Sequence, residues 1–325
     1  GQTGSVAEDA SVGDSVMTVS ITDSTPTAIL FSSGNGDGIF AIATTGVVTI
    51  ADASNLDYET TTSYTLTIVA YDASSSDVED ITISITNVND APTVSSAISD
   101  ASTAEDAAYS LDISGNFDDE DTSDSLSFSA TGLPSSGNLA ITSAGVISGT
   151  PTNADVGAHT IIVTATDDGT GTLTVSDTYV LTVTNTNDAP TVSSAISDAS
   201  SAEDAAYSLD VTGNFADVDV GDTLSYAATG MPSTLSMSTS GTISGTPVNA
   251  DVGAHTIIVT ATDSSSAAAT ASDTYILTVT NTNDAPTATA ISDASTAEDA
   301  AYSLDVSGNF ADVDVGDTLS YAATG

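Results

Sequence analysis

The sequence predicts an all-β protein made of β-sandwich domains that follow one another along the chain. Three observations support that prediction. Short runs of alternating apolar residues, such as Ile81, Ile83 and Ile85, have the period of half-buried strands. Long stretches recur almost unchanged at a spacing that suits one sandwich of about seven short strands. Each stretch closes on Asn-x-Asn-Asp-Ala-Pro, in which the proline forbids continuation of the strand ladder.

Internal repetition sets the predicted domain organisation. Three equivalent glutamates give a period of 98 and then 95 residues: Glu105, Glu203 and Glu298. Residues 1–90 share only the closing motif with the later copies. We therefore expect four segments: a domain at 1–90, domains at 91–188 and 189–284, and a partial repeat at 285–325. The partial repeat has about three strands, too few to bury two sheet faces. We expect the chain to continue within a longer repetitive polypeptide, or another chain to complete this half-domain.

The composition restricts the partners. The 325 residues include 45 acidic side chains and no lysine or arginine. Nucleic acid and anionic membranes are therefore excluded as electrostatic partners, because no side chain can neutralise a phosphate. Apolar residues make up 40% of the chain, with many strand-forming Val, Ile and Thr, so we expect it to fold. It has no cysteine, and a secreted protein without disulfides commonly uses a metal instead. The sequence has no transmembrane run, and cations are the expected partners.

Oxygen-bearing residues gather at each linker. In a seven-strand antiparallel sandwich that is entered at one pole and left at the other, the second and sixth loops lie at the entry pole. In residues 91–188 both of these loops are acidic. The second loop comprises residues 118–124, and the sixth loop begins at Asp167. Both should face back toward the preceding linker. From residues 1–90, Glu8, Asp57 and Glu59 should face forward to the same place.

The same reasoning assigns candidate metal ligands to all three linkers. The first linker receives Glu8, Asp57, Glu59, Asn87, Asn89, Asp90, Asp119, Asp121, Asp124 and Asp167. The second receives Glu105, Asp155, Asn185, Asn187, Asp188, Asp217, Asp219, Asp222 and Asp263. The third receives Glu203, Asp251, Asn281, Asn283, Asp284, Asp312, Asp314 and Asp317.

Clustered carboxylates need a cation. At about 5 Å and an effective dielectric near 20, one pair of like charges costs roughly 3 kcal/mol. Acidic loops can also be simply solvated, since Asp and Asn are common turn residues. The spacing Asp-x-Asp-x-x-Asp nevertheless recurs beside the linkers, from Asp217 and again from Asp312. Carboxylates with Asn and backbone carbonyls suit calcium better than magnesium, because calcium accepts looser geometry. We therefore predict several Ca²⁺ ions at the linkers.

The motifs resemble known families. The linker is similar to the Asp-x-Asn-Asp-Asn-x-Pro linker of cadherin repeats, and residues 1–90 resemble one such repeat through Leu56-Asp57-Tyr58-Glu59. Residues 145–151 and 154–157 resemble the dystroglycan-type, cadherin-like repeats of long microbial surface proteins. The resemblance implies tandem Ig-like, Greek-key sandwiches arranged end to end, with calcium stiffening each joint. Gly157 and Gly253 stand where the motif has Glu59, and Ser74 stands where cadherins have Asp, so we expect fewer ions per joint than in animal cadherins.

The leading functional hypothesis is a structural one. We expect an extracellular stalk or filament, part of a larger microbial surface adhesin, in contact with neighbouring repeats or with other copies of itself. The alternative is an adhesive module that binds glycans or its own kind. An enzyme is not expected: the sequence has no Gly-x-Ser-x-Gly elbow, no tryptophan to stack on a sugar and no zinc-ligand spacing. Asp177 is expected to be a solvated residue at a strand start.

Overall fold

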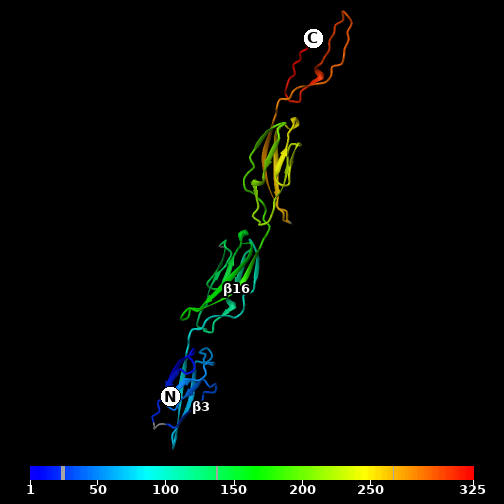
Figure 1. Cartoon of the computed structure of the whole chain (residues 1–325). Coiled ribbons are helices and arrows are strands. Elements are labelled where there is room, and N and C mark those ends of the chain that lie inside the picture. The colour runs from blue at the N-terminus through cyan, green and yellow to red at the C-terminus, as the bar shows by residue number, and fades with distance from the viewer. Residues whose placement is uncertain (23–25, 137, 266) are drawn as a thin grey trace. The chain divides into compact units, whose positions relative to one another are not determined.

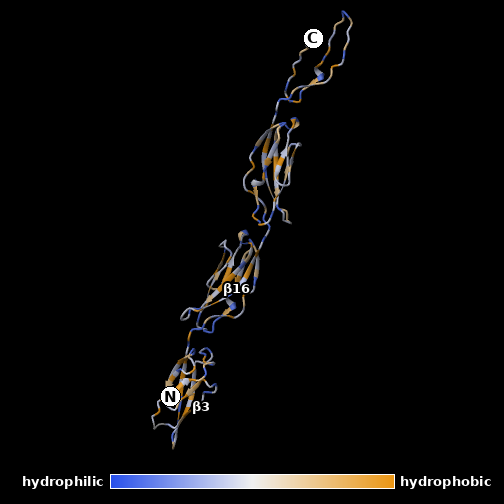
Figure 2. Cartoon of the chain, viewed as in Figure 1, coloured by the Kyte–Doolittle hydropathy of each residue, from blue (hydrophilic) through white to orange (hydrophobic). Residues whose placement is uncertain are grey.

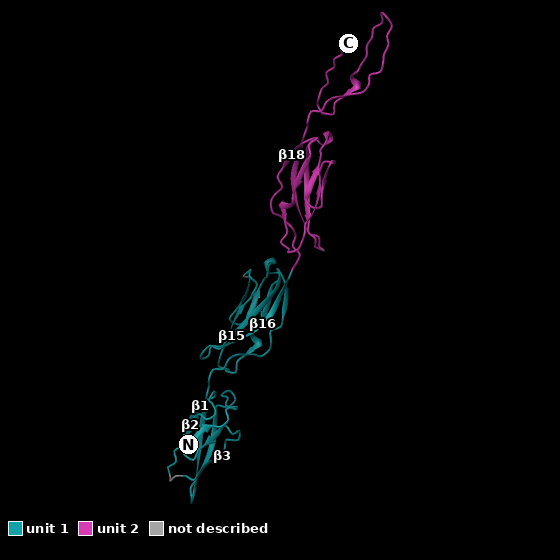
Figure 3. Cartoon of the chain, viewed as in Figure 1, with its two compact units in different colours: residues 1–184 teal, residues 185–325 magenta. Residues whose placement is uncertain are grey.

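The computed structural model describes residues 1–22, 26–136, 138–265 and 267–325. The chain divides into two compact units, residues 1–184 and residues 185–325, which Figure 3 shows in two colours. Nearly all regular structure in the described residues is β-strand, interrupted by single turns of 3₁₀ helix (Figure 1). The predicted all-β class with Ig-like and cadherin-like tandem domains is confirmed.

The first domain is a sandwich of two sheets within the described part of residues 1–90. The larger sheet has the spatial order β1 (Gln2–Ala7), β7 (Ser76–Thr86), β6 (Ser63–Tyr71) and β3 (Ala28–Ser33). The smaller sheet has the order β2 (Ser15–Thr18), β5 (Val47–Ile50) and β4 (Phe40–Ile42). The first strand pairs in parallel with the last, and the other pairs are antiparallel.

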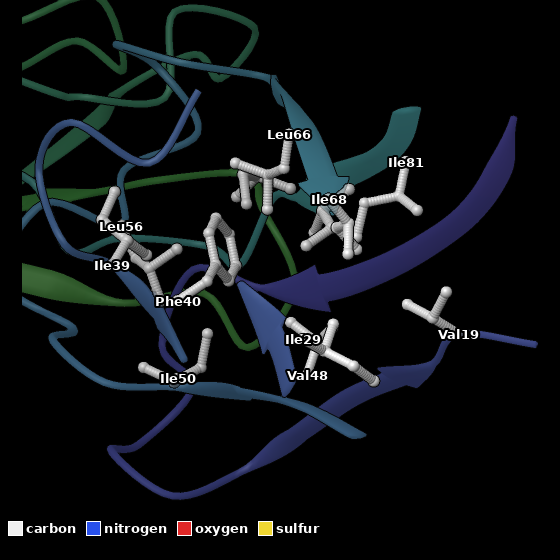
Figure 4. Close-up of a cluster of buried hydrophobic side chains, with 12 residues drawn as sticks. Val19, Ile29, Ile39, Phe40, Val48, Ile50, Leu56, Leu66, Ile68 and Ile81 are labelled. Carbon is white, nitrogen blue, oxygen red and sulfur yellow. The ribbon is translucent and has the colours of Figure 1, made fainter. Parts of the chain in front are cut away.

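Alternation along the strands builds the core of this domain. Ile81, Ile83 and Ile85 of β7 are at most 3% exposed, and the residues between them are less buried. Their side chains meet those of the smaller sheet, where Phe40 and Val48 lie in the same cluster (Figure 4). This inward row of apolar side chains is what the spacing in the sequence predicts.

The second domain, in unit 1, repeats this architecture with a small added pair. Its larger sheet has the order β9 (Ala101–Ala104), β16 (Thr174–Thr184), β15 (Gly157–Thr166) and β12 (Ser127–Thr131). Its smaller sheet has the order β10 (Tyr109–Asp112), β14 (Val146–Gly149) and β13 (Leu139–Ile141). The added pair is β8 (Thr93–Val94) with β11 (Phe117–Asp118), and the 3₁₀ turns are η1 (Ser114–Asn116) and η2 (Asn153–Asp155).

The third domain, in unit 2, has the same plan. Its larger sheet has the order β18 (Ala199–Ala202), β25 (Thr270–Thr280), β24 (Gly253–Thr262) and β21 (Ser225–Thr229). Its smaller sheet has the order β19 (Tyr207–Asp210), β23 (Thr242–Gly245) and β22 (Leu235–Met237). The added pair is β17 (Thr191–Val192) with β20 (Phe215–Ala216), and the turns are η3 (Thr212–Asn214) and η4 (Asn249–Asp251). In Figure 2 the hydrophobic colour concentrates on the strands of the domains.

Asp177 corrects one expectation from the sequence. It lies inside β16 and not at a strand start, and it is half-buried. Its Oδ2 accepts a hydrogen bond from the Ile98 backbone N–H at 2.7 Å, which ties the entering segment to the last strand. Asp273 holds the Ile196 N–H in the same way at 2.6 Å. The expectation was wrong because a polar residue in a strand can serve a backbone donor outside the ladder.

Residues 285–325 hold little regular structure. Their elements are β26 (Thr287–Ala288), η5 (Ser307–Asn309) and β27 (Phe310–Ala311). Tyr321 is 51% exposed, whereas Tyr226, at the equivalent position of the preceding repeat, is 8% exposed. These residues therefore bury their apolar side chains less well than the complete copies do. In the part of the chain that the structure describes, no helix has the length and apolar character needed to cross a membrane.

Candidate metal centres

Glu8 connects two segments at the first linker. Its Oε1 accepts a hydrogen bond from the Val88 backbone N–H at 2.6 Å, and its Oε2 accepts one from the Tyr58 N–H at 2.6 Å. The tip of β1, the turn before β6 and the linker are thereby held together. Carboxylate oxygens of Glu8, Asp57 and Glu59 lie within 4.8 Å of one another. Glu8 thus shares one small volume with two acidic side chains that lie about fifty positions later in the sequence.

Asp121 joins the same linker to the second domain. It follows β11 and is only 1% exposed. Its Oδ1 accepts from the Asn87 side-chain amide, and its Oδ2 accepts from the Asp90 backbone N–H, both at 2.7 Å. Asn89 in turn donates to Oδ2 of Asp167, at the end of β15, at 3.1 Å. Both acidic loops that the sequence predicts at the entry pole therefore contact the linker.

Gly169 lies close to the linker. A Cβ atom built on it would meet the Asn89 amide oxygen and Asp124 in the positions that these side chains adopt. Glycine leaves both oxygens where they are, and a larger residue would require these two side chains to move. The backbone of the loop after β15 therefore forms a cradle for the linker.

Within the described residues, several buried oxygens of this cluster have no hydrogen-bond donor. They are Oε2 of Glu59, Oδ2 of Asp119 and Oδ2 of Asp124. An unpaired buried acceptor costs roughly 1–3 kcal/mol, and more when it is charged. With no lysine or arginine in the chain, no cationic side chain can compensate these oxygens. The donor set therefore fits a metal cation.

The pKa shifts show the same crowding of charge. Burial raises the pKa of Glu59 to about 7, and the charges of Glu8 and Asp121 add to the rise. Burial also raises the pKa of Asp90 and of Asp119, again with help from neighbouring carboxylates. In contrast, the Thr60 hydroxyl and N–H hold the pKa of Asp57 below its usual value.

Of the ligands predicted for the second linker, those in residues 187–263 other than Asp251 make contacts with one another. The Asn187 amide donates to Oδ2 of Asp263 at 3.0 Å, and the Asp188 backbone N–H donates to Oδ2 of Asp219 at 2.7 Å. Oxygens of Asp217, Asp222 and Asp263 lie within 4.8 Å of one another. Asn185 is exposed. Glu105, in residues 1–184, is buried and its backbone N–H donates to Thr184.

The third linker repeats part of the first. Oε1 of Glu203 accepts from the Thr282 backbone N–H at 2.8 Å, as Glu8 accepts from Val88. Oδ2 of Asp314 accepts from the Asp284 N–H at 2.7 Å. Oxygens of these three acidic residues, Glu203, Asp284 and Asp314, lie within 4.8 Å of one another, and so do those of Asp312, Asp314 and Asp317. Asn281 and Asn283 are exposed.

Burial and neighbouring carboxylates also raise a pKa at the third linker. Burial raises the pKa of Asp284, and Asp204, Asp314 and Asp312 contribute to the rise. No donor reaches Oε2 of the buried Glu203 or Oδ1 of the buried Asp314 within the described structure. The third linker, like the first, therefore has buried oxygens that a cation would satisfy. The preceding domain contributes fewer carboxylates to the third linker than to the first.

Two predicted ligands point elsewhere. Asp155 and Asp251 lie in the turns η2 and η4, where their carboxylates cap the turn. Oδ2 of Asp251 accepts from the Thr234 hydroxyl at 2.6 Å and from the Val248 N–H at 3.1 Å. Asp155 accepts in the same manner from Ser136 and Thr152. The structure does not bring either carboxylate into the metal-type clusters of the described residues.

Asn249 is not among the ligands predicted from the sequence. It starts the turn that Asp251 caps, and its amide donates to Oδ2 of Asp284 at 3.0 Å. One signal was available: Asn-Ala-Asp-Val-Gly occurs unchanged in both complete copies, at the point where residues 1–90 have acidic residues. The prediction chose Asp251 because it is charged and did not consider the neutral Asn249 two positions earlier.

The fold and these linkers define a class of protein: tandem β-sandwich repeats joined through linkers that are lined by carboxylates. Residues 2–86 match the cadherin domain family, and residues 91–184 and 189–280 match the family described as putative Ig domain. The putative Ig domain matches cover more than half of the chain, so the chain belongs to that family, with a cadherin domain ahead of the two copies. No curated protein sequence matches the chain.

Solved structures with a similar fold are cadherin ectodomains. Mouse cadherin-23 EC22-24 is 18% identical, with a TM-score of 0.61 over 86% of this chain and 96% of that one. Protocadherin gamma B2 domains 1-5 are 22% identical, with a TM-score of 0.60 over 87% of this chain and 60% of that one. Mouse protocadherin-24 EC1-3 is 21% identical, with a TM-score of 0.56 over 86% and 97%. At these identities the likeness concerns the fold.

Proposed function

We propose that the linkers bind calcium and that the chain serves as an extracellular stalk of calcium-stiffened repeats. Buried carboxylate oxygens without a donor converge on the linkers, and the chain has no lysine or arginine to neutralise them. Cadherin domains typically bind Ca²⁺, which agrees with the match of residues 2–86.

The chemistry of the donor set supports calcium over other metals. Carboxylate, amide and backbone oxygens are hard ligands, and calcium takes six to eight of them in flexible geometry. The chain has no cysteine and two histidines, so it has few ligands of the kind that zinc prefers. The ring Nε2 of each histidine is engaged by a backbone carbonyl, that of Asp155 or that of Asp251.

The position of the clusters supports a stalk role. Glu8 and Asp121 belong to consecutive domains, and both hold backbone N–H groups of the same linker. A cation shared by such groups would lower the repulsion within the linker and restrict its movement. Repeats of this kind are typically structural or adhesive modules and not enzymes.

Small-angle X-ray scattering on the full chain tests this proposal. In calcium we expect one well-defined maximum dimension, and with chelator a more flexible particle, while circular dichroism stays β-rich. Asp112→Ala is a matched control, because within the described residues the Asp112 side chain accepts from Ser114, two positions later, and from no linker residue. Identical scattering with calcium and with chelator would contradict the proposal.

One observation favours a second candidate function, adhesion. Leu30, Val69 and Val78 are direct cross-strand neighbours on β3, β6 and β7. Leu30 and Val78 are 56% and 57% exposed, and Val69 between them is 9% exposed. Two exposed apolar side chains on one sheet face can contribute to the binding of a partner or a second copy. Sedimentation velocity of wild type and Leu30→Asp in calcium would show whether these side chains support self-association.

A further inference from the structure

We propose that Asn249 is a cation ligand of the third linker, in which a neutral amide oxygen takes the part that acidic side chains play in the first linker. This inference rests on the proposed calcium function. It concerns a side chain of the turn η4, which belongs to the domain before the linker. The ligand class is a hard divalent cation, with calcium as the probe.

The amide of Asn249 is already in contact with the cluster. Its Nδ2 donates to Oδ2 of Asp284 at 3.0 Å, so its Oδ1 must lie beside the same carboxylate. That Oδ1 is buried and receives no hydrogen bond within the described structure. A buried amide oxygen without a donor is costly, and a cation would satisfy it.

Two neighbouring carboxylates also have an oxygen that a cation would satisfy. Glu203 is 2% exposed and its Oε2 has no donor, and Asp314 is 5% exposed and its Oδ1 has no donor. Their other oxygens are held by linker backbone N–H groups, so both side chains are fixed in place. Carboxylate oxygens of Glu203, Asp284 and Asp314 lie within 4.8 Å of one another, and the Asn249 amide contacts the same Asp284.

The alternative ligand in the same turn is Asp251, which is in none of the carboxylate clusters found among the described residues. Its carboxylate is occupied by Thr234 and by the Val248 N–H, and these donors lower its pKa. Asp251 therefore shapes the turn, and the turn presents Asn249. In the first linker, the equivalent region offers Asp57 and Glu59, both within 4.8 Å of Glu8.

Calcium titration of the full chain by isothermal calorimetry tests the assignment. Asn249→Ala should weaken one calcium-binding event by about tenfold, the lower end of what supporting groups contribute around a metal. Asn249→Asp should strengthen that event, because a charged oxygen replaces a neutral one. Without calcium, Asn249→Asp should lower the midpoint of thermal unfolding, since it adds a carboxylate to an uncompensated cluster.

Controls separate this inference from the proposed function. Asn214→Ala removes an amide of the same domain that donates to Ser194 instead, and it should leave the titration unchanged. Glu203→Gln keeps the shape and removes a charge from the cluster. If Glu203→Gln weakens binding while Asn249→Ala does not, Asn249 is no ligand but calcium binding at this linker stands. If neither variant changes the titration, both fail. If Asn249→Asp weakens binding as Asn249→Ala does, the amide acts only by positioning Asp284.

Discussion

The first and third linkers share one backbone motif and differ in what the preceding domain contributes to them. At the first, Glu8, Asp57 and Glu59 form a cluster of three carboxylates. At the third, the preceding domain contributes Glu203 as the carboxylate and Asn249 as an amide. The same pair of hydrogen bonds, from the linker N–H groups to one Glu and one Asp, is present in both.

The difference teaches that positioning and charge are separable in these linkers. The shared hydrogen bonds hold the linker, so they recur in both types of repeat. The carboxylates around these hydrogen bonds determine how strong the repulsion is without a cation and how much a bound cation would stabilise the linker. The number of these carboxylates varies with the turn that precedes β6 or β24. We therefore expect calcium to bind more tightly at the first linker than at the third, since affinity rises with ligand charge.

The largest expected effect is that of Asp121→Ala. The variant leaves the amide of the exposed Asn87 and the N–H of the half-buried Asp90 without their acceptor, at roughly 0.5–1.5 kcal/mol for each lost hydrogen bond. We expect calcium affinity at the first linker to fall by about a hundredfold. Asp314→Ala should cost less at the third linker, because its Oδ1 accepts no hydrogen bond in the described structure. Calorimetric titration of both variants checks the order, and equal losses would contradict it.

The next effect is on pH dependence. Glu59 has its pKa raised from 4.5 to about 7, so in the calcium-free chain its stabilising contribution is present below about 4.5 and is lost as the pH rises through 7. Calcium must displace this proton, so affinity at the first linker should rise from pH 5 to 7 and then level off. Glu59→Gln should flatten that rise. A profile that is the same for wild type and Glu59→Gln would show that Glu59 does not titrate there.

A smaller effect of calcium is expected on proteolysis, which should differ between the turn beside the first linker and the central strands of the domains. The Tyr58 N–H is held by Glu8 in the first cluster, so loss of calcium should loosen this turn and admit chymotrypsin after Tyr58. Tyr179 and Tyr275 lie in central strands and are 1% exposed, so they should stay protected in both conditions. Mass spectrometry of early fragments checks this, with Glu8→Gln as a variant that keeps an acceptor. Cleavage after Tyr58 that is independent of calcium would contradict the prediction.

The smallest expected effect on calcium is that of Asp177→Ala. It removes the acceptor of the Ile98 N–H, so we expect the second domain to lose about 1–3 kcal/mol of stability. The calcium titration should not change. Asp273→Ala is the matched variant in the third domain, where the Ile196 N–H loses its acceptor. Thermal unfolding followed by circular dichroism measures both, and a change in calcium stoichiometry would place Asp177 in the metal site.

Much of this protein could be predicted from the order of residues alone. The alternation in β7 is a local property, because every second side chain of a strand faces the same way, so Ile81, Ile83 and Ile85 had to be buried together. Repetition then required the same fold for the later copies. The lack of lysine and arginine is a property of composition, and it means that no lysine or arginine of this chain neutralises the clustered carboxylates.

Only the tertiary structure decided which oxygens point into a linker. Asp251 has the charge that a sequence analysis favours, but its direction is set by Thr234 and by the backbone of η4. Asn249 has no charge, and the same turn directs it to Asp284. Asp177 is turned toward Ile98 by a donor that lies 79 positions away in the sequence. Side-chain direction depends on partners that folding brings together, and residue type by itself does not reveal them.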